Sequence, residues 1–147
     1  MRDKKIFIIE DDVNLLYGLE AQFNNAGFHV EINEADNDDD EILKHLRKFK
    51  PDYIVLDLIL PKVEGFELLQ RIKADDELGE KEVFIFTDLS DEDSRERSLE
   101  MGADYVFFKE DFDTFSFAEK VIKIIKNKNK GELEPNDDEG EFDLVID

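Results

Sequence analysis

The chain has no cysteine and no tryptophan, and only three of its 147 residues are proline. Without cysteine, disulfide bonds and thiolate zinc sites are excluded. The apolar runs are all far shorter than the roughly 20 residues that a membrane-spanning helix needs. The first apolar run begins at Ile6, which leaves no room for a signal peptide. We therefore expect one domain of ordinary size, cytoplasmic and without a membrane partner.

Positive charge is also scarce. Forty acidic residues stand against nineteen basic ones, which gives a formal net charge of −21. A nucleic-acid phosphate backbone would be repelled over most of such a surface, so we expect no nucleic-acid partner. The acidity either keeps the protein soluble or reflects a salty habitat, or it suits partners that present basic faces, and composition alone does not separate these explanations.

Several short apolar runs end at residues that suit phosphoryl chemistry. The runs are rich in β-branched and aromatic residues, as is typical of strands buried on both faces, and they cover 6–9, 53–56, 83–86 and 106–108. The residues that follow them are Glu10, Asp11 and Asp12, then Asp57, Thr87 and Lys109. In a parallel α/β sheet the carboxyl ends of the strands meet at one edge, where such folds place their ligands. We therefore expect these side chains to converge.

Helical patterns alternate with the runs. They cover 13–26, from the N-cap candidates 37–40 to about 49, 66 to about 74, from 90–93 to about 101, and 117–128. Residues 28–32 alternate in polarity and predict one further strand. The alternation predicts a (βα)5 α/β fold with right-handed crossovers and a parallel sheet covered on both faces.

The composition changes near the C-terminus. From Gly131 onward the chain has eight acidic residues and no basic one. We predict a folded domain at 1–128 and an acidic, mostly disordered tail at 129–147. The apolar patch 142–146 interrupts this tail. It is either part of a passive solubilising end or a peptide that docks on this chain or on a partner.

The predicted site suits a divalent cation and a phosphoryl group. Three carboxylates that lie close together, from Glu10, Asp11 and Asp57, raise one another's pKa unless a cation intervenes. Such hard oxygen ligands suit Mg²⁺, for which Mn²⁺ could substitute. A carboxylate beside this ion can attack phosphorus and form an acyl phosphate, while Lys109 neutralises one phosphoryl oxygen and Thr87 donates to another. The alternative is that acids gather at strand ends by chance in so acidic a chain.

The motifs as a set resemble the receiver domain of bacterial two-component response regulators, over residues 4 to about 128. They are Ile8-Ile9-Glu10-Asp11-Asp12, the segment Pro51 to Pro61 with Gly65, then Thr87, Gly102-Ala103 and Lys109. The resemblance implies a doubly wound, flavodoxin-like sheet with five parallel strands in the order 2-1-3-4-5. It also implies a regulator that catalyses only its own phosphorylation and dephosphorylation, with no external substrate.

The same resemblance implies roles for single residues. Asp57 would accept phosphate from a histidine kinase or a phosphotransfer protein. Glu10 and Asp11 would hold Mg²⁺ with Asp57 and the backbone carbonyl of Ile59. Thr87 would report phosphorylation by moving inward. Output would come from protein–protein contact through the face built by the fourth helix, fifth strand and fifth helix, in a stand-alone regulator or a phosphorelay intermediate.

Three positions depart from the family pattern. Asp88 replaces a small residue, Glu110 replaces the proline after the lysine, and Val106 stands where the family has its switch aromatic. Tyr105 is one residue away, and the two-residue period of a strand places it on the opposite face. These departures leave a second hypothesis open, a receiver fold that binds its partner regardless of phosphate.

Two further positions bear on the lifetime of the phosphorylated form. Ile59 and Leu89 lie two residues after Asp57 and Thr87, where the family places residues that help or block the hydrolytic water. Both are apolar and neither can orient a water, so we expect slow self-dephosphorylation.

Overall fold

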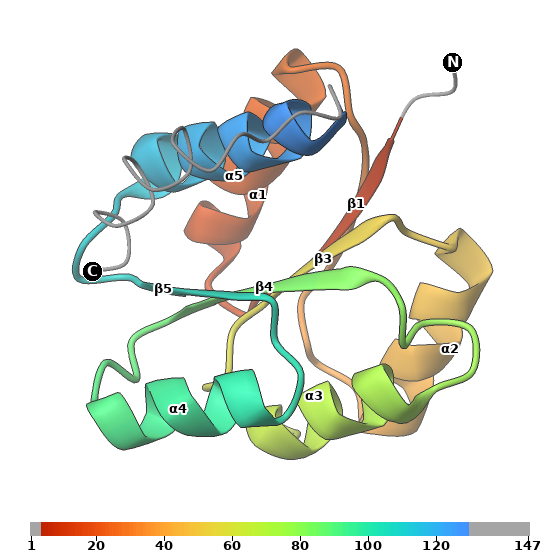
Figure 1. Ribbon diagram of the computed structural model, residues 1–147. Coiled ribbons are helices and arrows are strands. Elements are labelled where there is room, and N and C mark those ends of the chain that lie inside the picture. Colours follow the sequence, from red (N-terminus) through yellow and green to blue (C-terminus); the bar gives the residue numbers. More distant parts are fainter. Residues whose placement is uncertain (1–3, 130–147) are drawn as a thin grey trace.

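Figure 1 shows a computed structural model that describes residues 4–129. The strands are β1 (Lys5–Ile9), β2 (His29–Asn33), β3 (Tyr53–Leu56), β4 (Glu82–Thr87) and β5 (Tyr105–Phe108). The helices are α1 (Val13–Asn25), α2 (Asp39–Phe49), α3 (Gly65–Ala74), α4 (Glu92–Glu100) and α5 (Thr114–Asn129). Strands and helices alternate along the described chain, as the sequence predicts.

The strands form one parallel sheet in the order β2-β1-β3-β4-β5. This is the predicted order 2-1-3-4-5. The chain leaves β1 in one direction to build β2 and in the other to build β3, and open α/β sheets place their ligand sites at the carboxyl ends of the strands where the order reverses in this way. The predicted site residues follow these two strands and their neighbours.

Helices cover both faces of the sheet, with α1 and α5 on one side and α2, α3 and α4 on the other (Figure 1). The two-residue period of the strands divides their apolar side chains between two cores. The α1/α5 core includes Ile6, Ile8, Leu16, Phe23, Val55, Phe84, Phe86, Phe107, Phe117 and Val121. The α2/α3 core includes Phe7, Ile9, Ile42, Leu46, Ile54, Leu56, Leu69, Ile72, Val83 and Ile85.

Local chemistry sets the helix ends. The α5 helix begins at Thr114, three residues before the predicted start, because Asp113 and Ser116 cap it reciprocally. The Asp113 carboxylate accepts from the Ser116 backbone N–H at 2.8 Å, and the Ser116 hydroxyl accepts from the Asp113 N–H at 3.0 Å. Helix α2 ends at Phe49. The next residue, Lys50, adopts a left-handed conformation (φ 56°), and Pro51 follows it.

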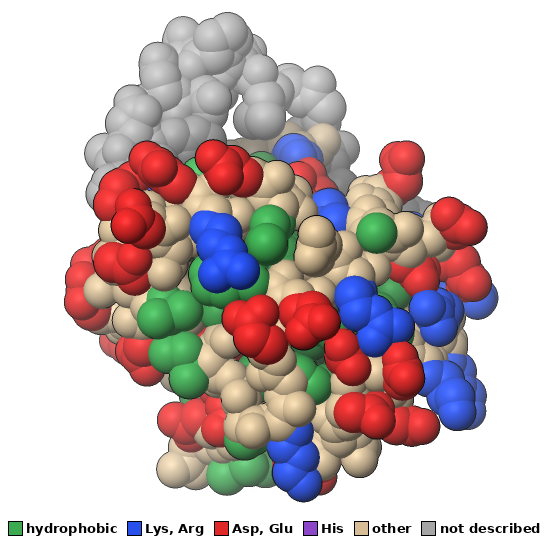
Figure 2. Space-filling model, turned by 90° about the horizontal axis from the view of Figure 1, so that it is seen from below, with side chains coloured by type: hydrophobic (Ala, Val, Ile, Leu, Met, Phe, Trp, Pro, Cys, Tyr) green, Lys and Arg blue, Asp and Glu red, His purple; other side chains and the backbone are tan. Residues whose placement is uncertain are grey.

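The α4 helix is held less firmly than the others. Ser98 is its one buried residue, and its apolar Leu99 is 39% exposed. The guanidinium of Arg97 lies 4.0 Å from the centre of the Phe66 ring, on the neighbouring α3. Figure 2 shows the face built by α2, α3 and α4, over which acidic side chains are widespread. An element with so little buried apolar surface belongs to the low end of local stability.

None of the helices in the described range 4–129 is long and apolar enough to cross a membrane. Beyond Asn129, the predicted tail and its apolar patch 142–146 lie outside the described residues.

Candidate functional site

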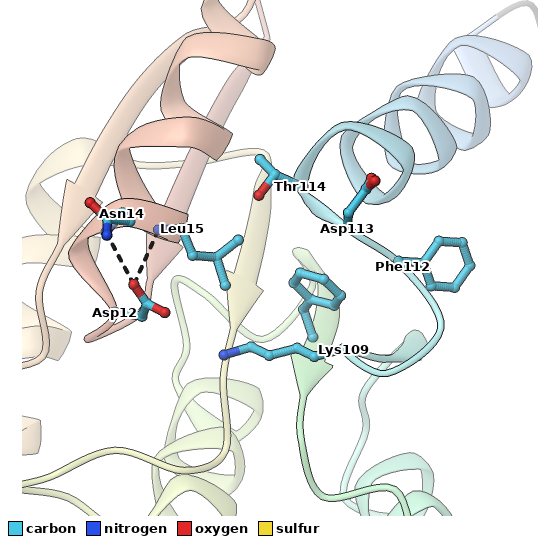
Figure 3. A pocket seen from close by; sticks show the side chains of 8 residues that line it. Asp12, Asn14, Leu15, Lys109, Phe112, Asp113 and Thr114 are labelled. Carbon is cyan, nitrogen blue, oxygen red and sulfur yellow. Dashed lines mark hydrogen bonds between the residues drawn. The ribbon is translucent and has the colours of Figure 1, made fainter.

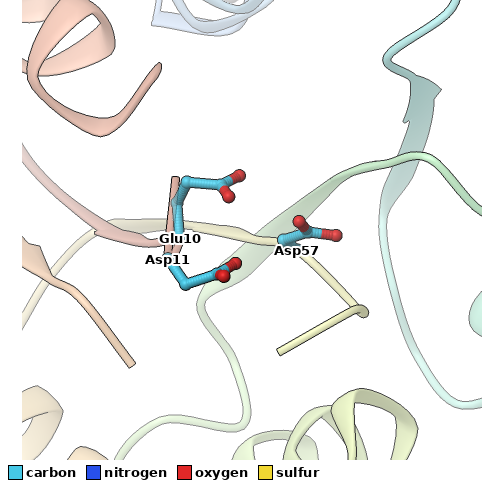
Figure 4. A group of neighbouring side chains, drawn as sticks. All are labelled: Glu10, Asp11 and Asp57. Carbon is cyan, nitrogen blue, oxygen red and sulfur yellow. The ribbon is translucent and has the colours of Figure 1, made fainter. Parts of the chain in front are cut away.

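Three carboxylates meet at the carboxyl edge of the sheet. Glu10 directly follows β1 and Asp57 directly follows β3, and both are buried, at 3% and 4% exposure. Backbone hydrogen bonds continue the ladder past the strand ends and hold both residues in place, from the Glu10 N–H to Asn33 and from the Asp57 N–H to Ile9, each at 3.2 Å. One oxygen each of Glu10, Asp11 and Asp57 lies within 4.8 Å of the others, and in Figure 4 the Glu10 and Asp11 side chains extend toward the side where Asp57 lies.

Lys109 supplies positive charge to this group. Its ammonium lies 2.9 Å from Glu10 Oε1 and 2.9 Å from Asp57 Oδ2. Its backbone N–H donates to the Thr87 carbonyl at 2.8 Å, which extends the β4–β5 pairing by one residue. Burial lowers the pKa of Lys109, but the hydrogen bonds and charges of Asp57 and Glu10 outweigh it and the pKa stays above its usual value.

One ammonium does not balance three carboxylates. Burial, and then the charge of Asp57, raise the pKa of Glu10 to about 7, although hydrogen bonds from the Asp12 N–H and from Lys109 oppose the rise. A divalent cation would remove this unfavourable charge. The donors are carboxylate oxygens, two from buried residues and one from the exposed Asp11, and this set fits Mg²⁺ or Mn²⁺. The described residues therefore include a group able to hold a metal at the predicted place.

The Asp57 carboxylate is oriented from two sides. Its Oδ2 accepts from Lys109, and its Oδ1 accepts from the Ile59 backbone N–H at 3.1 Å. The loop after Asp57 packs tightly against the start of α3. A Cβ added to Gly65 would lie 2.2 Å from the Leu58 carbonyl oxygen. Only glycine fits there. The Ile59 backbone thus lies beside Asp57, while the role of its carbonyl as a metal ligand stays a prediction.

Thr87 lies at the end of β4, fully buried. Its Oγ1 accepts a hydrogen bond from the Leu89 N–H at 3.2 Å, so the hydroxyl hydrogen is available for another acceptor. The loop between β4 and α4 contacts the loop after β5, where the Ser90 hydroxyl donates a hydrogen bond to the Glu110 carboxylate at 3.3 Å. Asp88 and Glu110, the two acids that depart from the family pattern, are both exposed.

A cavity beside Lys109 has no signal in the sequence. Its volume is about 340 Å³, and it lies between the loops that follow β1 and β5 (Figure 3). Its walls come from Asp12, Asn14, Leu15, Phe86, Lys109, Phe112, Asp113 and Thr114. These residues belong to α1 and the loop before it, to β4, and to the segment from Lys109 to the start of α5, and they meet only in the folded chain, so no local motif marks the cavity.

The predicted division of β5 between two faces is confirmed. Tyr105 packs against the α1/α5 core and stacks on Phe84, with ring centres 4.8 Å apart and planes at 12°. Val106 packs against the α2/α3 core instead. The face of β5 toward α4 therefore has valine at the position where the family carries its aromatic residue.

Comparisons with known proteins identify the family. The response regulator receiver domain matches residues 6–121. The transcriptional regulatory protein AfsQ1 of Streptomyces coelicolor is 32% identical over 144 residues, which is 97% of this chain and 59% of that protein. The chain spans about half the length of the curated relatives it matches.

Solved structures agree. The receiver domain of a DNA-binding response regulator from Colwellia psychrerythraea has a TM-score of 0.74 and 28% identity, with 85% of this chain and 99% of that chain covered. The phosphorylated cyanobacterial phytochrome response regulator RcpA has a TM-score of 0.70 and 27% identity, with 86% and 93% covered. The fold, the acidic edge and the sequence match agree, and the chain belongs to the response regulator receiver domain family.

Proposed function

We propose that the chain is the phosphoacceptor part of a two-component or phosphorelay system, and that Asp57 is the residue phosphorylated. The observation that carries this proposal is the buried Asp57 carboxylate, 2.9 Å from the Lys109 ammonium and grouped with two further carboxylates. This complete acceptor set does not favour the phosphate-independent module as the alternative. The receiver's catalysis is limited to its own phosphorylation and dephosphorylation.

The phosphoryl donor we propose is a phosphohistidine on a histidine kinase or a phosphotransfer protein. An Asp57 oxygen attacks phosphorus, the phosphorus–nitrogen bond breaks, and the imidazole nitrogen leaves with a proton. The product is an acyl phosphate on Asp57. In this step Lys109 neutralises phosphoryl charge, and Thr87 donates its hydroxyl hydrogen to a phosphoryl oxygen.

The metal we propose is Mg²⁺, with Mn²⁺ as a substitute, held by Glu10, Asp11, Asp57 and the Ile59 carbonyl. When bound, it supplies positive charge that draws the phosphoryl oxygens to Asp57 and stabilises the transferring group. The protein's own contribution is to hold Asp57 in one orientation, through the Ile59 N–H and Lys109.

Output, we propose, passes to a downstream protein through the face built by α4, β5 and α5, in the cytoplasm. The matched relatives are transcriptional regulators. For this chain, with its net charge of −21, we propose a protein partner rather than nucleic acid.

The test is the intact mass after incubation with Mg²⁺ and acetyl phosphate, and separately with phosphoramidate. We expect one phosphoryl adduct that is lost in Asp57→Ala. Asp76→Ala is the matched control, since Asp76 is an exposed acid in the turn after α3 and should leave the adduct unchanged. Absence of an adduct with both donors, together with no beryllofluoride binding, would favour the phosphate-independent module.

A further inference from the structure

Thr87 and Phe108 are direct neighbours across the last pair of strands. The β4–β5 register pairs Thr87 with Phe108, and paired residues on adjacent strands lie about 5 Å apart with their side chains on the same face. Strand alternation places Thr87 on the face of Val83 and Ile85, which belong to the α2/α3 core. It places Phe108 on that face too, two residues after Val106.

Phe108 differs from the other aromatic residues of β5. The Phe107 ring packs edge-on against Phe112 and Phe117, at 5.3 and 5.4 Å between centres, and Tyr105 stacks on Phe84. Phe108 is half-buried and belongs to neither core, and no ring–ring contact of the described residues includes it. Its ring can therefore change rotamer without disturbing a packed core.

The loop between Thr87 and α4 depends on the same hydroxyl. Thr87 Oγ1 accepts from the Leu89 N–H, and Ser90 then reaches across to Glu110. The α4 helix that follows has one buried residue, Ser98. A turn of the Thr87 hydroxyl toward a phosphoryl group on Asp57 would strain or break the Leu89 hydrogen bond and open space beside Phe108.

We infer that Phe108 is the residue that responds to phosphorylation in this chain. Its ring moves inward into the space that Thr87 leaves, and the loop that leads into α4 is released with it. Val106 cannot serve in this way, because it has no ring and packs against the α2/α3 core, and Tyr105 faces the other side of the sheet. The inference rests on the proposed function, since Thr87 turns only if Asp57 carries the phosphoryl group.

The chain has no tryptophan, so Phe108→Trp adds a single fluorescent reporter at this position. With Mg²⁺ and phosphoramidate, we expect a shift of its emission maximum and weaker quenching by acrylamide, in samples whose adduct is confirmed by intact mass. In the double variant that carries Phe108→Trp and Thr87→Ala, we expect no emission shift once the signal is normalised to the fraction of molecules phosphorylated. Tyr105→Trp is the matched control, on the same strand and the opposite face, and its emission should not change.

A second measurement avoids the bulk of tryptophan. Hydrogen exchange over residues 88–100 should change on phosphorylation of the unmodified chain, and this change should be lost in Phe108→Leu although the adduct forms. An adduct with an unchanged Phe108→Trp spectrum, or an undiminished exchange response in Phe108→Leu, would overturn the inference. The lack of any adduct would instead show that the proposed function has failed, and the inference with it.

Discussion

The interior of the sheet and its carboxyl edge follow opposite rules. In the interior, Ile6, Phe7, Ile8 and Ile9 of β1 are fully buried between two apolar cores. One residue later, Glu10 is also buried, at 3% exposure, but carries a carboxylate beside two others. The interior lowers the free energy of the fold, whereas the edge retains unfavourable charge that a cation and a phosphoryl group can use. Functional sites are where a sequence departs from the rules that stabilise the rest of the fold.

The largest effect should come from the interior. Phe117 is fully buried, stacked on Phe86 with ring centres 3.8 Å apart. Phe117→Ala should lower the free energy of unfolding by about 3–5 kcal/mol, measured by urea denaturation, because a cavity replaces the ring. Phe115→Ala, two residues earlier and 58% exposed, is the control and should cost less than about 0.5 kcal/mol. Equal losses would contradict the division between core and surface on α5.

The next effect should come from the edge. Mg²⁺ at about 100 times its dissociation constant should raise the free energy of unfolding by about 2.7 kcal/mol, because it binds only the folded chain. Thermal and urea unfolding in Mg²⁺ and in a chelator would measure this. Asp11→Asn should lose most of the gain, whereas Asp76→Asn makes the same change of charge away from the site and should keep it. A gain retained in Asp11→Asn would show that the metal binds elsewhere.

A smaller, kinetic effect is expected at the rim of the edge. Ile59 is 48% exposed, lies beside the proposed phosphoacceptor Asp57, and has an apolar side chain that cannot orient a water molecule. Ile59→Asn should shorten the lifetime of phosphorylated Asp57 several-fold, less than the roughly 100-fold typical of a positioned proton-transfer group. Decay of the adduct by intact mass gives the lifetime, and Ile59→Leu should leave it unchanged. An unchanged lifetime in Ile59→Asn would refute the role of this position.

The smallest effect concerns α4. This helix lies outside both regions and buries little apolar surface. Arg97→Ala removes the cation–π contact with Phe66 and should cost about 0.5–1 kcal/mol. Hydrogen exchange should rise in α4 more than in α5. Arg95→Ala is the control, since Arg95 forms a 3.9 Å ion pair with exposed Glu92 and its loss should change exchange less. If both variants behave alike, the contact with Phe66 does not anchor α4.

The sequence by itself determined the strands, the helices and the acidic edge. Short apolar runs that alternate with helical patterns predict a parallel sheet covered on both faces, and the residues that follow such strands meet at one edge. The two-residue period of a strand also assigns Tyr105 and Val106 to opposite faces of β5, whatever packs against them. These features are local or repetitive, so they can be read along the chain.

Only the tertiary structure decided how distant residues pair. It placed Lys109 between Glu10 and Asp57, assembled the cavity from the start of α1, the end of β4 and the segment between β5 and α5, and set Phe108 beside Thr87. Register and side-chain direction depend on contacts between segments far apart in the chain, which local patterns do not encode. Helix α5 shows the same limit at short range, because its apolar pattern begins at Phe117 while capping by Asp113 and Ser116 starts it at Thr114.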